Sequence, residues 1–237
     1  MNISNLNQQL QGVYQTYLDT IYSQTWPENV SSPLLMDVFQ EYGEMEKKVM
    51  FVGQETHGWG NMSGKFSVEK LQTEYHEFDL GKRANYPNGK RYLKSPFWNF
   101  SRAFFYNLNK QNVAVSRKTN GFLWTNISKI DHKSTTPSFE LQQQNESGFE
   151  LLKHEIDITK PDVVIFLTGT KYDSWLEKLF TIKNEVIIEN GFLSMLHDQS
   201  KLLPLLTFKT KHPRTLSSQK MYHAVLQKMT EMATEHN

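Results

Sequence analysis

The chain has 237 residues, of which 38% are hydrophobic and 13% aromatic, a composition typical of a folded globular protein and not of a disordered one. Its net charge is +1 and it has no cysteine, which excludes disulfides, cysteine-bound zinc and iron–sulfur clusters and favours a reducing compartment. No apolar run approaches the roughly 18 residues of a membrane span, and no secretion signal is evident, so we expect a cytoplasmic protein that does not contact the membrane.

The hydrophobic pattern predicts helices that alternate with strands. In chain order we expect a helix over 5–24, a short helix over 33–42, a strand over 48–53, a long irregular segment over 54–95, a helix over 97–109, a strand over 121–127, a polar loop over 131–146, a helix over 148–158, a strand over 162–167, a helix over 171–180, a short strand over 185–189, a strand over 203–208 and a closing helix over 216–234.

This alternation predicts an α/β fold. We expect a three-layer α/β/α sandwich with a mainly parallel central sheet of about four strands. The chain reads as a single domain over 1–237, in which residues 1–46 form a helical N-terminal extension and residues 47–237 form the core.

Charge is unevenly distributed along the chain. Residues 1–46 contain six acidic side chains and no lysine or arginine, whereas the segments 81–94 and 209–220 are basic and contain no acidic residue. Basic groups beside aromatic ones suit a polyanion whose bases can stack. Taken alone, however, each basic segment is more typical of a solvated loop.

Polar side chains stand at the ends of three expected strands. In an open parallel sheet these ends meet at one crevice, where such folds bind their ligands. A carboxylate, an amide and an imidazole around one crevice can position water, read a planar polar ring and stabilise a developing anion. The side chains are Gln54, Glu55 and His57 after the first strand, Asn126 at the end of the second, and His212 after the last.

Short motifs in this order resemble the uracil-DNA glycosylase superfamily. Residues 53–57, Gly-Gln-Glu-Thr-His, are similar to the family's Gly-Gln-Asp-Pro-Tyr motif, and residues 212–217, His-Pro-Arg-Thr-Leu-Ser, are similar to its His-Pro-Ser-Pro-Leu-Ser motif. Residues 122–126 resemble the strand that ends in the base-reading asparagine. Residues 64–68 resemble the segment with the stacking phenylalanine, and residues 160–167 resemble the central strand.

The resemblance implies a monomeric base-excision repair enzyme that flips a base out of single- or double-stranded DNA and hydrolyses its N-glycosidic bond, with no metal and no cofactor. In catalysis it implies that Glu55 orients the attacking water and that His212 stabilises the leaving base. It further implies that the substrate is bound by Gln54, His57, Phe66 and Asn126, and that DNA is held by Arg214, by Ser217 and by Leu216 as a wedge.

Five positions depart from the family pattern. Glu55 is one methylene longer than the usual aspartate, and Thr56 replaces a proline, which predicts a less rigid turn. His57 stands in place of a tyrosine that excludes thymine, while Arg214 and Thr215 replace serine and proline. The departures leave the excised base open.

Two alternatives to a glycosylase remain. One is a relative that binds nucleic acid without catalysing a reaction, and the other is a hydrolase of free nucleosides or nucleotides. Each key residue also has a simpler interpretation when it is taken singly. Glu55 fits a solvated carboxylate after a turn, Asn126 fits a turn cap, and His212 fits a loop that enters a helix.

Overall fold

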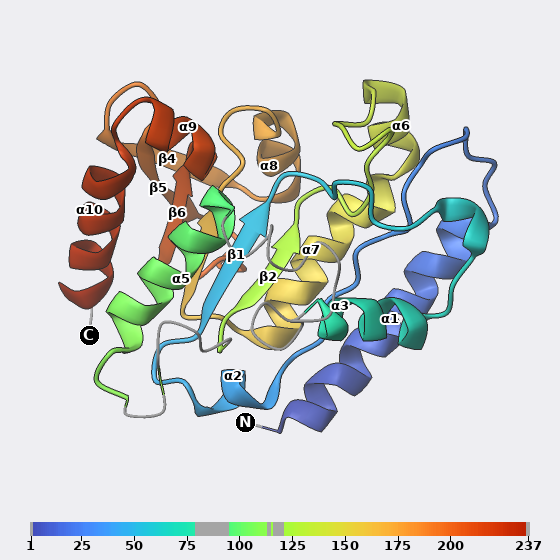
Figure 1. Cartoon of the computed structure of the whole chain (residues 1–237), viewed down its shortest axis with the longest axis horizontal. Helices are drawn as coiled ribbons and strands as arrows, with labels where there is room; N and C mark the ends of the chain where they lie inside the picture. Colours follow the sequence, from blue (N-terminus) through green and yellow to red (C-terminus); the bar gives the residue numbers. More distant parts are fainter. Residues whose placement is uncertain (1, 79–94, 113–114, 116–120, 236–237) are drawn as a thin grey trace.

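The structure is a computed structural model that describes residues 2–78, 95–112, 115 and 121–235 (Figure 1). The basic segment 81–94 lies outside the described residues, so its predicted part in binding a polyanion stays a prediction. Within the described ranges, no helix is both long and apolar enough to cross a membrane.

A six-stranded sheet forms the centre of the molecule. Its spatial order is β2 (Leu123–Asn126), β1 (Val49–Gly53), β3 (Val163–Phe166), β6 (Leu206–Thr210), β5 (Leu193–Asp198) and β4 (Ile182–Ile188). The first four strands in this order run parallel, and β5 pairs antiparallel with both β6 and β4. β1, β2 and β3 are buried along their whole length, as expected for parallel strands covered on both faces.

Two groups of helices cover the sheet. In the first group α5 (Pro96–Asn109), α9 (Pro213–Ser218) and α10 (Tyr222–Glu235) contact one another. In the second group α7 (Glu146–Thr159) contacts both α1 (Ile3–Tyr22) and α8 (Asp173–Leu179), and α3 (Val68–Glu77) also contacts α1. Figure 1 shows α10 at one side of the molecule and α1 at the other. The predicted α/β/α class is therefore confirmed.

The sheet has six strands, whereas about four were expected in it and five strand segments were predicted along the chain. The strand that was not expected is β5, where Ser194 and His197 interrupt the apolar pattern. The expected strand over 185–189 is the longer β4, which forms a hairpin with β5.

Two helix predictions and two loop predictions also need correction. Residues 33–39 are not helical because the Leu34 amide donates a hydrogen bond to the Lys129 carbonyl, and only α2 (Gln40–Glu44) forms nearby. The closing helix is broken into α9 and α10 at Lys220, which has a φ of 59°. The two expected loops contain short elements, namely η1 (Met62–Gly64) and α3 in the first and α6 (Phe139–Gln144) in the second.

Candidate active site

The adjacent ends of β1 and β2 hold the Asn126 side chain in a defined place. Gly53 pairs with Asn126, and the pairing continues beyond the strands because the Ile127 and Ser128 amides donate hydrogen bonds to the Gly53 and Gln54 carbonyls at 3.0 and 2.9 Å. The Asn126 side chain lies across Gly53, since a Cβ at position 53 would be only 2.3 Å from Asn126 Oδ1. Glycine at this position leaves the space for the amide.

The Asn126 side-chain amide is available to a ligand. Asn126 is 8% exposed, and among the residues that the structure describes none makes a hydrogen bond to this amide. The backbone carbonyl of Asn126, by contrast, accepts a hydrogen bond from Lys129 Nζ at 3.0 Å. A side-chain amide presents a donor and an acceptor together, which is the pattern that reads the edge of a nucleobase.

The Glu55 carboxylate is held by three donors. The Tyr172 hydroxyl donates to Oε2 at 2.7 Å, while Lys171 Nζ and the Thr136 hydroxyl each donate to Oε1 at 3.1 Å. Burial and the nearby Glu55 charge raise the pKa of Tyr172, so its phenol stays protonated and can donate. An ionised carboxylate has about four lone-pair sites, so these contacts orient Glu55 and leave roughly one site open.

Gln54 joins the ends of β1 and β3. Its Nε2 donates to the Thr168 carbonyl at 2.9 Å, and its Oε1 accepts from Lys171 Nζ at 3.2 Å. Lys171 therefore bridges the side chains of two neighbouring motif residues, Gln54 and Glu55. Because both ends of the Gln54 amide are occupied, this side chain is placed to organise the site.

His212 lies at the end of β6 and caps α9. Its Nδ1 accepts a hydrogen bond from the Arg214 amide at 3.2 Å. Burial, followed by the positive charges of Arg214 and Lys171, lowers the pKa of His212 to about 4, although Glu55 acts in the opposite direction. The ring is therefore neutral at physiological pH. With Nδ1 acting as acceptor, its proton sits on Nε2, which becomes a hydrogen-bond donor.

Phe97 connects the two halves of the site. Its ring stacks beside the His212 ring with centroids 6.3 Å apart and an interplanar angle of 23°. Phe97 Cε2 would also be 3.4 Å from a Cβ at Gly53, the residue that Asn126 covers. Ser95 and Pro96 begin α5 at this point and so bring Phe97 to the sheet edge. A planar ligand read by Asn126 would have this aromatic ring close by.

The turn after β1 is fixed by hydrogen bonds. The Thr56 hydroxyl donates to Asp131 Oδ2 at 2.6 Å, and the Gly58 amide donates to the same oxygen at 2.8 Å. Thr56 and Asp131 are both buried, so these hydrogen bonds hold the turn where the family pattern has a proline, and its lower rigidity stays a prediction. His57 is exposed, and its Nδ1 donates to the Ser134 carbonyl at 2.7 Å, which places its ring at the rim.

Phe66 has a different environment. It is 37% exposed, its ring lies against Gly64, and its carbonyl accepts a hydrogen bond from the Tyr22 hydroxyl at the end of α1. In the described part of the chain, no ring contact joins Phe66 to Phe97 or His212. Its predicted role in stacking on a base stays a prediction.

The last motif divides into exposed and buried side chains. Arg214 and Ser217 are exposed on α9, and the Ser217 hydroxyl donates to the Pro213 carbonyl at 3.0 Å. Leu216 is 0% exposed and packs in the core. This burial is at odds with the predicted wedge, because a side chain that enters DNA must be exposed.

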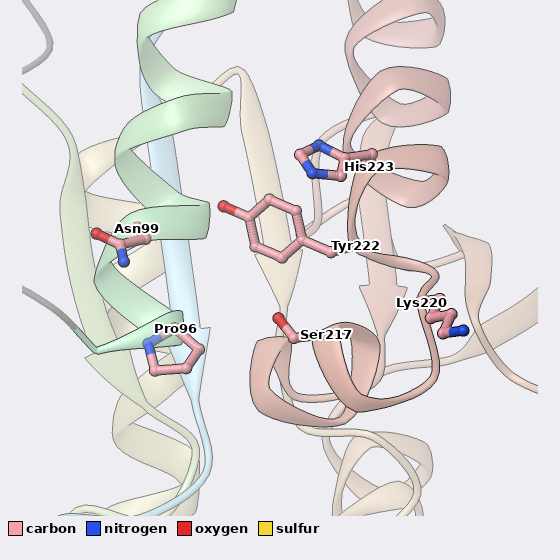
Figure 2. A pocket seen from close by; sticks show the side chains of 6 residues that line it. All are labelled: Pro96, Asn99, Ser217, Lys220, Tyr222 and His223. Atoms are coloured by element: carbon pink, nitrogen blue, oxygen red, sulfur yellow. The ribbon is translucent and has the colours of Figure 1, made fainter.

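A pocket of about 480 Å³ lies between the start of α5 and the α9–α10 turn. Figure 2 shows the hydroxyl group of Tyr222 pointing toward α5, with Ser217 close to the Tyr222 ring and the Lys220 side chain directed away from α5. The pocket therefore adjoins α9, the helix that exposes Arg214. Its lining residues are Pro96, Asn99, Ser217, Lys220, Tyr222 and His223.

Several residues of the site were not expected from the sequence. Lys171 and Tyr172 follow the third strand, where the sequence suggested only a helix start, and Phe97 fitted an ordinary apolar helix face. Asp131 stands in what read as a polar loop. Only the position of Lys171 after a buried strand could have indicated a site residue.

Comparison with known proteins identifies one family. The family model described as the uracil DNA glycosylase superfamily matches residues 39–233. No curated protein matches the chain. The matched region contains every side chain of the site described above, and α1 precedes it.

Proposed function

The chain belongs to the uracil DNA glycosylase superfamily, and on this basis we propose that it is a DNA glycosylase that removes uracil or a related base by hydrolysis. One observation carries the proposal: the Asn126 amide, without a partner among the described residues, lies over Gly53, and Phe97, also beside Gly53, stacks on the neutral His212 ring. Together these groups suit a flipped base, which needs its polar edge read and its face covered.

The reaction needs little from the protein beyond placement and charge. A water oxygen forms a bond to the sugar C1′, the C1′–N bond breaks, and its electron pair leaves with the base. The proton that the water loses ends on the released base. His212 Nε2–H would donate to the base carbonyl oxygen, where negative charge develops. Glu55 would stabilise the positive charge on the sugar and hold the water at its open lone-pair site.

The cations around the site support the departure of an anion. Lys171 lies 3.1 Å from Glu55, and the field of Arg214 and Lys171 adds to burial, the main cause, in lowering the pKa of His212. The same field would favour the negatively charged base as it leaves and the phosphates of the strand. Arg214, Ser217 and His57, all exposed, would contact DNA, whereas Leu216 would first have to leave the core.

Uracil-containing oligonucleotides test the proposal. Single-stranded and duplex forms are incubated with the protein, and alkali then cleaves at abasic sites. We expect cleavage at uracil by the wild type and loss of cleavage in Glu55→Gln and in His212→Ala. His197→Gln is the matched control, because His197 pairs with Glu185 on the β4–β5 hairpin. No product from the wild type, or equal product from all the variants, would contradict the assignment.

A second candidate is a nucleic-acid-binding relative without turnover. The observation that favours it is the Glu55 carboxylate, in which three donors occupy most of the capacity that a water would use. Binding that weakens with salt, without release of base, would select this candidate. Release of base from free deoxyuridine but not from oligonucleotides would select a nucleoside hydrolase.

A further inference from the structure

Lys129 is an ionisable residue buried completely beneath the site. Its side chain is 0% exposed, and its ammonium group donates to Glu155 Oε2 at 2.6 Å, to the Thr125 hydroxyl oxygen at 2.6 Å and to the Asn126 carbonyl at 3.0 Å. The three N–H groups of the Lys129 ammonium thus each have one acceptor oxygen. One of these acceptors belongs to the residue whose side chain reads the base in the proposed function.

Stability alone does not explain this arrangement. A buried ion pair is often no more stabilising than apolar side chains of the same volume, because both charges lose their hydration. Neither side chain of the Lys129–Glu155 pair reaches solvent. Such a pair instead supplies directional bonds that fix the groups around it.

The network continues into the N-terminal helix. Glu155 Oε1 accepts a hydrogen bond from the Tyr14 hydroxyl at 3.0 Å, and Oε2 also accepts from the Thr125 hydroxyl at 2.9 Å. Tyr14 is 0% exposed and lies on α1, which precedes the region 39–233 matched by the family model. Hydrogen bonds therefore connect α1 to the backbone of Asn126 through Glu155 and Lys129.

We propose that Lys129 is a positioning residue for Asn126, and that α1 serves the site by holding the Lys129–Glu155 pair through Tyr14. The inference rests on the proposed function, because it assumes that Asn126 reads the base. The Asn126 side chain occupies the narrow space over Gly53, so a small movement of its backbone would redirect the amide. Lys129 restrains that backbone from the buried side, opposite the ligand.

Two kinds of variant separate positioning from general packing. Lys129→Met combined with Glu155→Gln removes both charges together, so that no unpaired buried charge remains. Tyr14→Phe removes one hydroxyl group from the network. Tyr17→Phe is the matched control, since Tyr17 is a buried tyrosine of the same helix whose hydroxyl donates to Asn145 Oδ1 at 2.8 Å.

Nuclear magnetic resonance of the Asn126 side-chain amide, assigned by its loss in Asn126→Ala, tests the proposal without any need for catalysis. We expect its paired signals to shift or broaden in the double variant and, less strongly, in Tyr14→Phe, and to stay unchanged in Tyr17→Phe. Unchanged Asn126 signals in the folded double variant would overturn the proposal. If that variant does not fold, equal spectra for Tyr14→Phe and Tyr17→Phe would overturn it.

Excision of uracil from an oligonucleotide supplies the second readout. The double variant should lower kcat/KM by up to about 100-fold relative to the wild type. When the same two substitutions are added to Asn126→Ala, kcat/KM should not fall below that of Asn126→Ala alone. An equal loss in both backgrounds would show a purely structural role and overturn the proposal. A wild type that excises no base would refute the proposed function, while the amide signals would still decide whether Lys129 positions Asn126.

Discussion

Replacing Gly53 with alanine should displace the Asn126 side-chain amide without unfolding the protein. The added Cβ would lie 2.3 Å from Asn126 Oδ1, so the amide oxygen must move to at least 3.0 Å, the limit below which real Cβ contacts essentially never occur. Phe97 Cε2, at 3.4 Å, can stay in ordinary contact. Since a misplacement of about 1 Å can cost about 100-fold in rate, we expect kcat/KM to fall by about 10- to 100-fold.

The assay measures uracil excision under single-turnover conditions, together with thermal unfolding. Gly12→Ala is the matched control, because nothing lies within 4 Å of a Cβ at this position of α1, and the change should add about 0.5–1 kcal/mol of stability at unchanged activity. Full excision by Gly53→Ala would refute the placement of Asn126. A loss of activity that follows a collapse in unfolding temperature would also refute it.

Three further predictions concern charge, the turn after β1 and α9. Burial and the Arg214 charge lower the pKa of His212 from 6.5 to about 4. The neutral ring therefore contributes its full stabilisation above pH 6.5, and this contribution is lost as the pH falls through about 4. A titration of the His212 ring by nuclear magnetic resonance with its midpoint above about pH 6 would contradict this prediction. Thr56→Val should lower the free energy of unfolding by about 1–3 kcal/mol in urea, because buried Asp131 loses a donor, and an unchanged value would refute the role of this hydrogen bond. Leu216→Ala should cost about 2–5 kcal/mol of stability and leave DNA affinity intact, because Leu216 is buried. Arg214→Ala should weaken DNA binding and reduce the slope of log affinity against log salt concentration by about 1. The opposite pattern would support Leu216 as a wedge.

Local pattern predicts those parts of the fold that are buried from both sides. The apolar runs of β1 and β3 identify parallel strands because such strands are covered on both faces. The same reasoning fails for β5, whose polar residues include Ser194 and His197. It also fails for residues 33–39, where the Leu34 amide donates a hydrogen bond to the distant Lys129 carbonyl and not within a helix. The break at Lys220 depends on a single backbone angle that composition does not reveal.

The candidate site shows the same division. Glu55, Asn126 and His212 follow apolar strands in an order that a family resemblance can detect. Lys171 and Tyr172 come to Glu55 across more than a hundred residues of sequence, through the parallel pairing of β1 and β3, which no local signal encodes. The burial of Leu216 likewise depends on how α9 packs on α5. The motif match alone therefore predicted an exposed wedge at Leu216, whereas the structure buries this side chain in the core.

The most direct measurement of the central claim uses water labelled with oxygen-18. The protein is incubated in this water with a uracil-containing oligonucleotide, and the masses of the released base and of the abasic oligonucleotide are measured by mass spectrometry. The proposed attack at C1′ predicts free uracil without label and one labelled oxygen on the abasic sugar, with both products lost in Glu55→Gln. An oligonucleotide that stays intact, or a label found in the released base, would contradict the claim that this site hydrolyses an N-glycosidic bond.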